Sequence, residues 1–358
     1  MKEFKIAMVS IMLAVAFASA MDINPYGFIR FNGVWSDGVR YSSETDGTFN
    51  AFPVDTGSYQ NGPIYERASR FQFAANQSTI GVNISDSISE GRLILTGKLE
   101  GDFRNYFIMN HGFINFSFPR IGLNILLGQT DALFVPYNPP TVNHRKLVST
   151  GNLGLRQRPQ IRLTQKISSI EVAVAAREEN VDYPIIEGKI NTTGPIKIGA
   201  SAFWHSSKRA GVSYIDYDYD EPDSYGLAAD IFADIGIVNI SGEFFTGQNI
   251  KRYIYGSIQE HSYNSSSKSN SIGGWGALGF KASDNLNINV GAGSEYLLDE
   301  YYWSDNGIWL NRAIFANINY KLTPNATLAL EYFRHDTEYN DDRTGSYNRV
   351  ETAITYGF

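Results

Sequence analysis

Cysteine is absent from this chain of 358 residues, which excludes a disulfide framework and a thiolate metal site. Charged residues are scarce, at 19% against roughly a quarter in ordinary globular proteins. Beyond residue 20 no segment approaches the roughly 20 apolar residues that a membrane-spanning helix requires. The HExxH, GxSxG and P-loop patterns are also missing, which excludes these three catalytic signatures. The net charge of −7, without a basic surface motif, disfavours nucleic-acid binding.

Aromatic residues and glycine are abundant. The chain has 22 tyrosines, 22 phenylalanines and 33 glycines, and aromatic residues make up 14% of it. Mean hydropathy is nevertheless −0.24, so the chain is not apolar on average. This combination suits a structure with an apolar outer surface and a polar interior, as in a membrane barrel.

The first twenty residues have the features of a secretory signal peptide. Lys2 and Lys5 supply the positive end, residues 6–17 the apolar stretch, and residues 18–20 (Ala-Ser-Ala) the cleavage motif. The apolar stretch is short for a membrane helix, which makes a retained N-terminal anchor the weaker interpretation. We expect residues 1–20 to be removed on export, leaving residues 21–358 as a single barrel domain.

The dominant hydrophobic period in the rest of the chain is two, which predicts β-strands. In residues 92–103, for example, Leu93 and Leu99 alternate with Lys98 and Glu100. This alternation fits a soluble sandwich, whose polar face meets water, and equally a membrane barrel, whose apolar face meets lipid. Many of the segments reach the 9–11 residues of a membrane-crossing strand, which favours the barrel.

Sixteen segments alternate in this way, an even number, as a closed bacterial barrel requires. They lie at about 26–35, 68–85, 91–102, 105–118, 120–130, 155–167, 169–178, 183–190, 194–206, 224–234, 236–249, 270–282, 285–299, 307–321, 325–339 and 345–358. Short turns mostly alternate with longer loops at about 36–67, 131–154, 207–223, 250–269 and 299–307, the asymmetry typical of outer-membrane barrels. The connections at 103–104 and 179–182 are short exceptions. We therefore predict an all-β fold, a closed antiparallel transmembrane β-barrel of sixteen strands.

The last predicted strand places Ile354, Tyr356 and Phe358 on one face, and the chain ends on an aromatic residue. This arrangement resembles the C-terminal signal of outer-membrane proteins, which the barrel-insertion machinery recognises. We therefore expect that machinery to be a partner of the chain during assembly.

Several motifs in the first half of the chain resemble those of Gram-negative outer-membrane porins, and most closely those of the DcaP-like group. They are residues 26–30 (YGFIR), 69–71 (SRF), 98–103 (KLEGDF), 128–134 (GQTDALF) and 158–162 (RPQIR). The second half is similar only in its pattern. The resemblance implies a homotrimer and a third loop that narrows the channel.

The alternation also predicts a ladder of basic side chains. If Leu93 and Leu163 face lipid, residues of the opposite parity face the lumen, including Glu100 and Asp102. The basic members are Arg30, Arg70, Arg92, Lys98, Arg156, Arg158, Arg162 and Lys166. An Arg or Lys on the lipid face near the midplane would cost about 2–4 kcal/mol, which favours this orientation. Such a wall selects anions in a pore, or else its members brace the barrel by pairing with acids such as Glu351.

Residues 131–154 form the candidate constriction loop. The segment resembles the inward-folded loop of porins, and its Pro139-Pro140 pair stiffens it. Phe134 and Tyr137 would be unusual in a solvated loop, whereas packing against the inner wall explains them. Asp131 is placed to face the basic ladder across the lumen. The alternative is an ordinary surface loop.

The sequence favours an outer-membrane porin that lets small hydrophilic, preferentially anionic solutes diffuse passively. One alternative is a structural or adhesive barrel with a plugged lumen, which acts through the acidic, tyrosine-rich loop at 216–223. Another is a barrel enzyme using His111 and Ser117, although about 20 Å of strand separates them. We expect no cofactor and no metal site, and we expect outer-membrane lipid and lipopolysaccharide around the protein.

Overall fold

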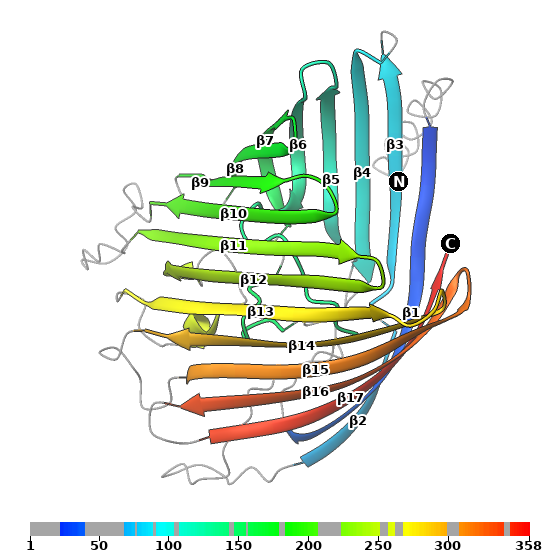
Figure 1. The fold of residues 1–358 in the computed structure, drawn as a ribbon, viewed down its shortest axis with the longest axis vertical. Coiled ribbons are helices and arrows are strands. Elements are labelled where there is room, and N and C mark those ends of the chain that lie inside the picture. Colours follow the sequence, from blue (N-terminus) through cyan, green and yellow to red (C-terminus); the bar gives the residue numbers. More distant parts are fainter. Residues whose placement is uncertain are drawn as a thin grey trace, which may run out of the picture.

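The computed structural model describes residues 22–39, 68–75, 77–88, 91–103, 107–142, 147–154, 157–178, 183–206, 223–250, 257–261, 268–298, 308–339 and 344–358. The expected signal peptide, residues 1–20, lies outside these ranges. Within them the chain forms one sheet that curves round into a barrel (Figure 1). No helix in these ranges is long and apolar enough to cross a membrane.

The sheet contains seventeen strands, joined mostly as consecutive hairpins. They are β1 (Asp22–Val39), β2 (Ala68–Ala74), β3 (Thr79–Ile88), β4 (Leu93–Phe103), β5 (Phe107–Phe118), β6 (Leu123–Asp131), β7 (Gln157–Ile167), β8 (Ile170–Arg177), β9 (Ile185–Thr192), β10 (Ile196–His205), β11 (Ser224–Ile235), β12 (Val238–Gln248), β13 (Asn270–Lys281), β14 (Leu286–Leu297), β15 (Ile308–Thr323), β16 (Ala326–Tyr339) and β17 (Thr344–Gly357). One short 3₁₀ helix, η2 (Ile258–His261), lies between β12 and β13.

The barrel closes where the last strand meets the first. β17 pairs antiparallel with β1 from Phe28 opposite Gly357 to Ser36 opposite Arg349. Phe358 continues this pairing, because Gly27 and Phe358 exchange backbone hydrogen bonds of 3.1 and 3.0 Å. β2 and β3 pair with successive parts of β1 and occupy one position between them. The prediction of a closed, sixteen-strand antiparallel barrel is therefore confirmed.

The predicted continuous strand at 68–85 is wrong in detail, because it is broken between β2 and β3. Ala74 lies opposite Asn32 and Thr79 opposite Phe28, so the second strand contains one more residue than β1 can pair. The extra length is taken up by a short turn. There the Ser78 hydroxyl donates to the Ala75 carbonyl at 3.0 Å and accepts the Arg30 N–H at 3.1 Å.

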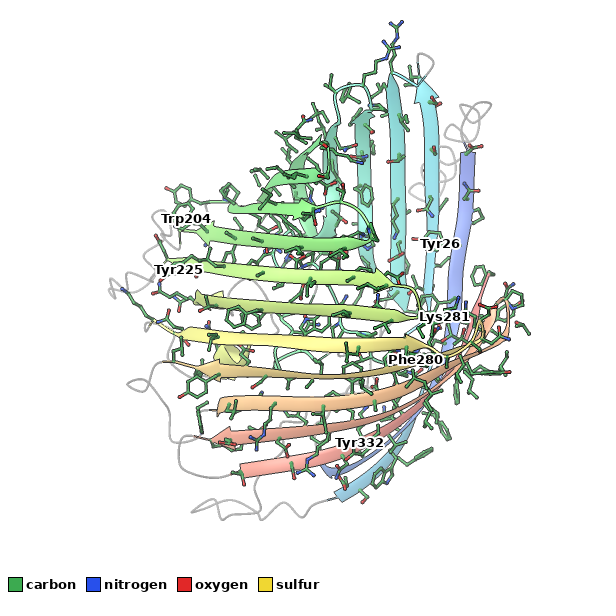
Figure 2. The ribbon with its side chains drawn as sticks, viewed as in Figure 1. Tyr26, Trp204, Tyr225, Phe280, Lys281 and Tyr332 are labelled. Atoms are coloured by element: carbon green, nitrogen blue, oxygen red, sulfur yellow. The ribbon has the colours of Figure 1, made fainter. Side chains whose placement is uncertain are left out.

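The wall has an exposed apolar face outside and a buried, mixed face inside. Along β11, Leu227 and Ile231 are exposed, whereas Ala228 and Asp230 between them are buried. Aromatic residues stand at both rims of the outer face, with Trp204 and Tyr225 at the long-loop end and Phe280 at the short-turn end (Figure 2). An apolar band between aromatic girdles is the pattern of a barrel that crosses a membrane.

Candidate functional site: a constriction inside the barrel

The segment after β6 crosses the inside of the barrel behind β11 to β14 (Figure 1). We call residues 132–154 the constriction loop, which the structure describes at 132–142 and 147–154. Wall carboxylates on three strands accept backbone N–H groups of this loop. The bonds join Leu133 N to Glu187 Oε2 at 2.8 Å, Tyr137 N to Glu243 Oε1 at 2.7 Å, and Val142 N to Glu331 Oε2 at 2.7 Å. Three short hydrogen bonds from the loop backbone to carboxylate oxygens of the wall anchor the loop.

Two arginines of the predicted ladder bind loop carbonyls. Arg162 donates to the Asp131 carbonyl where the loop leaves β6. Arg30 donates to the Val142 carbonyl at 2.5 Å and contacts Glu351 at 3.3 Å. These contacts clamp the first described stretch of the loop at both ends, so Arg30 and Arg162 position the loop as well as lining the wall.

Apolar side chains of the loop fill the space between it and the wall. Phe134 is buried against Phe203 of β10, with ring centroids 4.8 Å apart in an edge-to-face arrangement. Leu147 packs among aromatic side chains of β13 and β15, including Trp275 and Phe315. Most loops are polar, and this packing explains why the constriction loop contains apolar residues.

Tyr137 lies at the middle of the first described stretch of the loop, and two side chains of the wall contact its ring. It stacks on Phe232 at 6.1 Å, and Lys189 Nζ lies 4.8 Å from its ring centroid. Burial, together with the nearby carboxylates of Asp230 and Glu243, raises the pKa of the Tyr137 phenol to about 12. The phenol is therefore uncharged at neutral pH.

Where the constriction loop leaves β6, the strands β4 to β6 form a polar cluster with Tyr26 of β1. Glu100 accepts hydrogen bonds from the Tyr26 hydroxyl at 2.5 Å and pairs with Lys98 at 3.0 Å. His111 Nε2 lies 3.7 Å from Glu100 Oε1 and 4.0 Å from Asp131 Oδ2. The cluster places groups of both charges on one side of the lumen.

Other charges of the inner wall are buried in pairs. Arg177 pairs with Glu187 at 3.1 Å, Lys189 with Asp230 at 3.1 Å, and Arg349 with Glu351 at 2.7 Å. Glu243, Glu295 and Glu331 are buried as well and accept hydrogen bonds. Many of the acidic side chains inside the barrel are thus occupied by structural contacts.

The inner-wall charges that stay at least partly accessible lean towards positive. Among the described side chains, the basic ones are Arg30, Lys98, Arg158, Arg162, Lys166, Lys197, Lys281 and Lys321. The acidic ones are Asp22, Glu100, Asp131, Glu171 and Asp234. The lumen therefore presents a modest excess of basic groups although the whole chain is acidic.

The structure places the predicted site residues as follows. Arg30, Lys98, Glu100, Asp102, Arg158 and Arg162 lie on the inner face, and Lys166 lies on it at the end of β7. Arg92 differs from expectation, because β4 begins after it and Arg92 is exposed in a turn. The Arg70 side chain and the whole of Arg156 lie outside the described residues, and Ile354, Tyr356 and Phe358 are exposed on the outer face.

Sequence reasoning missed the glutamates that anchor the loop. A signal was present, since Glu187 stands in the apolar run Ile185-Ile186-Glu187-Gly188, and Glu243 precedes two phenylalanines. A charge at such a position must face inward. What it would bind there was not evident, because the loop that it contacts is far away in the sequence.

The structure gives no support to the enzyme alternative. His111 lies on the inner wall, where Nδ1 contacts Thr130 Oγ1 at 3.0 Å, and the alternation of β5 places Ser117 on the same inner face. A pair that hydrolyses membrane lipid would have to face the lipid, and these two residues face the lumen. In the described ranges no group of three His, Cys, Asp or Glu side chains is arranged to hold a metal ion.

A closed antiparallel barrel with a loop folded into its lumen is the fold of the outer-membrane porins. Neither a protein-family model nor a curated protein matches the chain. Among solved structures, it is similar to the outer membrane channel DcaP of Acinetobacter baumannii, with a TM-score of 0.75 and 16% identity over 95% of this chain and 98% of that one.

Two further porin structures show the same fold. The anion-selective porin from Comamonas acidovorans gives a TM-score of 0.63 with 10% identity, over 94% of this chain and 100% of that one. Salmonella typhi OmpF gives a TM-score of 0.61 with 11% identity, over 94% of this chain and 97% of that one. At these identities the likeness concerns the fold.

Proposed function

We propose that the chain is an outer-membrane porin through which small hydrophilic, preferentially anionic solutes diffuse passively. Support comes from the porin-type barrel and from the similar structures, one titled an outer membrane channel and another an anion-selective porin. The proposal makes the protein a channel of the bacterial outer membrane and not an enzyme.

The observation that carries the proposal is how charge is distributed between loop and wall. Glu187, Glu243 and Glu331 are buried and bind the constriction loop, so a passing solute does not contact them. Lys98 and Arg158 remain partly accessible. In a narrow lumen with low-dielectric walls, accessible basic groups attract anions.

Reversal potentials across a planar bilayer in a salt gradient test this proposal. The double variant K98Q/R158Q is expected to lower the anion preference by about two- to fivefold, because one unit charge near an ion contributes about 1 kcal/mol in water-like surroundings. The matched control, R312Q/R334Q, removes the same charge from the exposed outer face. Cation selectivity of the wild type would refute the anion preference, and absence of any conductance would favour the plugged, adhesive barrel.

We also propose a homotrimer, in which outer-face aromatic residues of β1, β2, β4 and β5 form the contact. Phe71 and Phe73 lie edge to face at 4.8 Å, Phe31 stacks on Phe73 at 5.4 Å, and Phe103 lies 5.6 Å from Phe107. All five are exposed in the single chain. OmpT of Vibrio cholerae, a similar fold, has been solved in a trimer form.

Two further partners belong to the proposal. The exposed row of Ile354, Tyr356 and Phe358 supports recognition of the C-terminal strand by the barrel-insertion machinery. The exposed apolar band supports contact with outer-membrane lipid and lipopolysaccharide.

A further inference from the structure

Two aromatic rings beside the constriction loop remain partly accessible to the lumen. Tyr137 of the loop stacks on Phe232 of β11, with ring centroids 6.1 Å apart and ring planes inclined by 24°. Other rings that pack between the loop and the wall are almost completely buried, among them Phe134 at 1% and Trp275 at 5% exposure. Tyr137 and Phe232 are only partly buried, so packing of the loop does not use their whole surface.

Two lysines contact this pair of rings, and one of them is accessible. Lys189 Nζ lies 4.8 Å from the centroid of the Tyr137 ring, but Lys189 is buried and pairs with Asp230 at 3.1 Å. Lys197 Nζ lies 5.7 Å from the centroid of the Phe232 ring, and this side chain is only partly buried. Lys197 therefore offers a positive charge to a solute that lies on the rings.

Amide side chains and a carboxylate line the wall next to the rings. Asp234 is exposed and lies two residues from Phe232 along β11, on the same face of the sheet. Asn239 of β12 lies opposite Asp234, and Gly279 of β13 lies opposite Asn239. A Cβ at Gly279 would lie 2.8 Å from Asn289 Oδ1 and 3.3 Å from Asn239 Cβ. Glycine at this position therefore makes room for both amides.

The amide of Asn289 is held by a network that reaches the constriction loop. Its Nδ2 donates to Asn317 Oδ1 at 2.8 Å, and Asn317 Nδ2 donates to the Pro140 carbonyl at 2.7 Å. The Asn289 side chain is partly accessible, and its oxygen lies over Gly279. The loop thus fixes the orientation of an amide that a solute can contact.

This combination of groups is suited to hydroxyl groups. An amide both donates and accepts hydrogen bonds, whereas a carboxylate only accepts them. A hydroxyl group can bind either one, because it donates one hydrogen and has two acceptor lone pairs. A simple anion offers acceptors alone, and Asp234 would repel it. Asparagine is also depleted in strands, so strand propensity does not explain Asn239 and Asn289.

We propose that this surface of the lumen is a binding site for cyclic sugar acids on their way through the pore. The apolar face of the sugar ring lies on Tyr137 and Phe232, its carboxylate lies at Lys197, and its hydroxyl groups bind the two amides and Asp234. A neutral sugar lacks the group that Lys197 binds, and an aromatic or aliphatic acid lacks the hydroxyl groups. The inference rests on the proposed porin function and names the class of its solute.

Block of the ion current through the wild-type protein in planar bilayers tests this site. Three probes are compared by the concentration that halves the open-channel current. Glucuronate has a ring, hydroxyl groups and a carboxylate, whereas glucose lacks the carboxylate and cyclohexanecarboxylate lacks the hydroxyl groups. Glucuronate is expected to block at about tenfold lower concentration than either of the other two, because only glucuronate makes both kinds of contact.

Single substitutions locate the site on the wall. N239A removes one amide and K197Q removes the accessible positive charge. Each is expected to raise the half-blocking concentration of glucuronate about three- to tenfold, and K197Q should leave block by glucose unchanged. The matched controls are N124A and K321Q, which remove the same groups from inner-face positions on β6 and β15.

Several outcomes would overturn the site. Equal block by glucuronate and cyclohexanecarboxylate would show that the hydroxyl groups are not recognised, and equal block by glucose would refute the role of Lys197. An equal effect of N124A or K321Q would place binding elsewhere in the lumen. Absence of any conductance would refute the porin proposal together with the site. A conducting, anion-selective channel that glucuronate does not block would refute the sugar-acid site alone.

Discussion

Glu331 illustrates how a single residue holds the constriction. Its Oε2 accepts the Val142 N–H at 2.7 Å and the Asn317 amide at 3.0 Å, and the side chain is buried. Asn317 also donates to the Pro140 carbonyl at 2.7 Å. One carboxylate therefore connects the end of the first described stretch of the loop to both β15 and β16. A buried donor left without a partner costs about 1–3 kcal/mol, so loss of this acceptor is expensive.

Replacement of Glu331 by leucine is expected to loosen the loop. The Val142 N–H and the Asn317 amide each lose an acceptor, which should cost about 1–3 kcal/mol per donor. We expect larger fluctuations of the open-channel current in planar bilayers and a lower urea midpoint. E331Q serves as the control, because its amide oxygen can still accept from the loop. Current noise and stability of E331L equal to those of wild type would show that Glu331 does not anchor the loop.

At the scale of single residues, the sequence predicted less of the structure than at the scale of strands or of the whole barrel. Arg30 and Arg162 could be placed on the inner face by alternation with Ile29 and Leu163. Their partners, the carbonyls of Val142 and Asp131, could not be predicted. Every residue has a backbone carbonyl, so the sequence does not show which one an arginine binds. Arg30 and Val142 are 112 residues apart along the chain, and only the closure of the barrel brings them together.

The elements of the wall are shaped to receive the loop. Gly293 of β14 faces inward, where an added Cβ would lie 2.1 Å from the Thr150 carbonyl and 3.3 Å from a Leu147 methyl. The loop therefore rests directly on the backbone of the strand. A side chain at this position would hold the loop away from the wall and towards the lumen.

Replacement of Gly293 by alanine is expected to displace the part of the constriction loop around Thr150. The contact with the Thr150 carbonyl lies well below a permitted carbon–oxygen separation, so the loop has to move. Single-channel conductance in planar bilayers should change measurably, and unfolding should cost about 1–3 kcal/mol less than in wild type. G188A is the matched control, because its methyl group points outward into nearly open space. Unchanged conductance in G293A would mean that the loop does not rest on this strand in solution.

The strands themselves were largely predictable from the period of two. Errors arose where one element depends on another. The break between β2 and β3 follows from the length of β1 available for pairing, and the N-terminal start of β1 at Asp22 follows from its pairing with β3. A strand read alone contains no information about the length of its neighbour.

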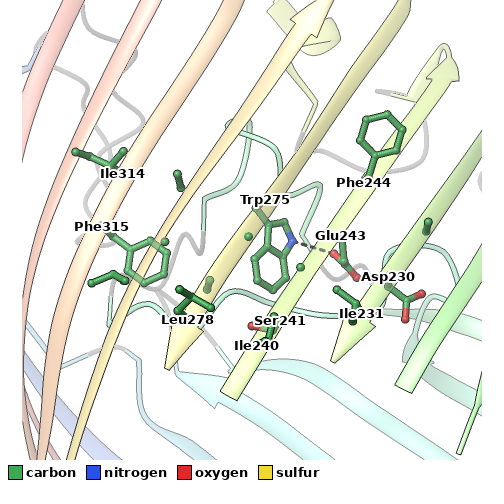
Figure 3. A pocket seen from close by; sticks show the side chains of 17 residues that line it. Asp230, Ile231, Ile240, Ser241, Glu243, Phe244, Trp275, Leu278, Ile314 and Phe315 are labelled. Carbon is green, nitrogen blue, oxygen red and sulfur yellow. Dashed lines mark hydrogen bonds between the residues drawn. The ribbon is translucent and has the colours of Figure 1, made fainter. Parts of the chain in front are cut away.

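At the scale of the whole molecule, the outer face is not uniform. Exposed phenylalanines gather on β1 to β5, whereas between β11 and β15 the small residues Gly242, Gly276 and Ala292 leave a shallow hollow (Figure 3). This division is consistent with subunit contacts on one part of the barrel and lipid contacts on another.

Serine substitutions test the proposed subunit contact. F71S/F73S removes exposed ring surface from the aromatic cluster and is expected to shift the protein from trimer to monomer in mild detergent. The molecular mass by sedimentation or light scattering measures this shift. W204S/Y225S removes comparable rings from the opposite part of the outer face and should leave the oligomer intact. A monomeric wild type would refute the trimer, and a trimeric F71S/F73S would place its interface elsewhere.

The sequence alone determined the architecture, because alternation along a strand records which face meets the apolar surroundings and which faces inward. It also favoured packing of Phe134 and Tyr137 against the inner wall over an ordinary surface loop. The tertiary structure decided the role of each charged side chain. It showed which acidic residues bind the loop, which pair with buried arginines, and which basic residues stay accessible. Those roles depend on contacts between strands far apart in the chain, which only closure of the barrel brings together.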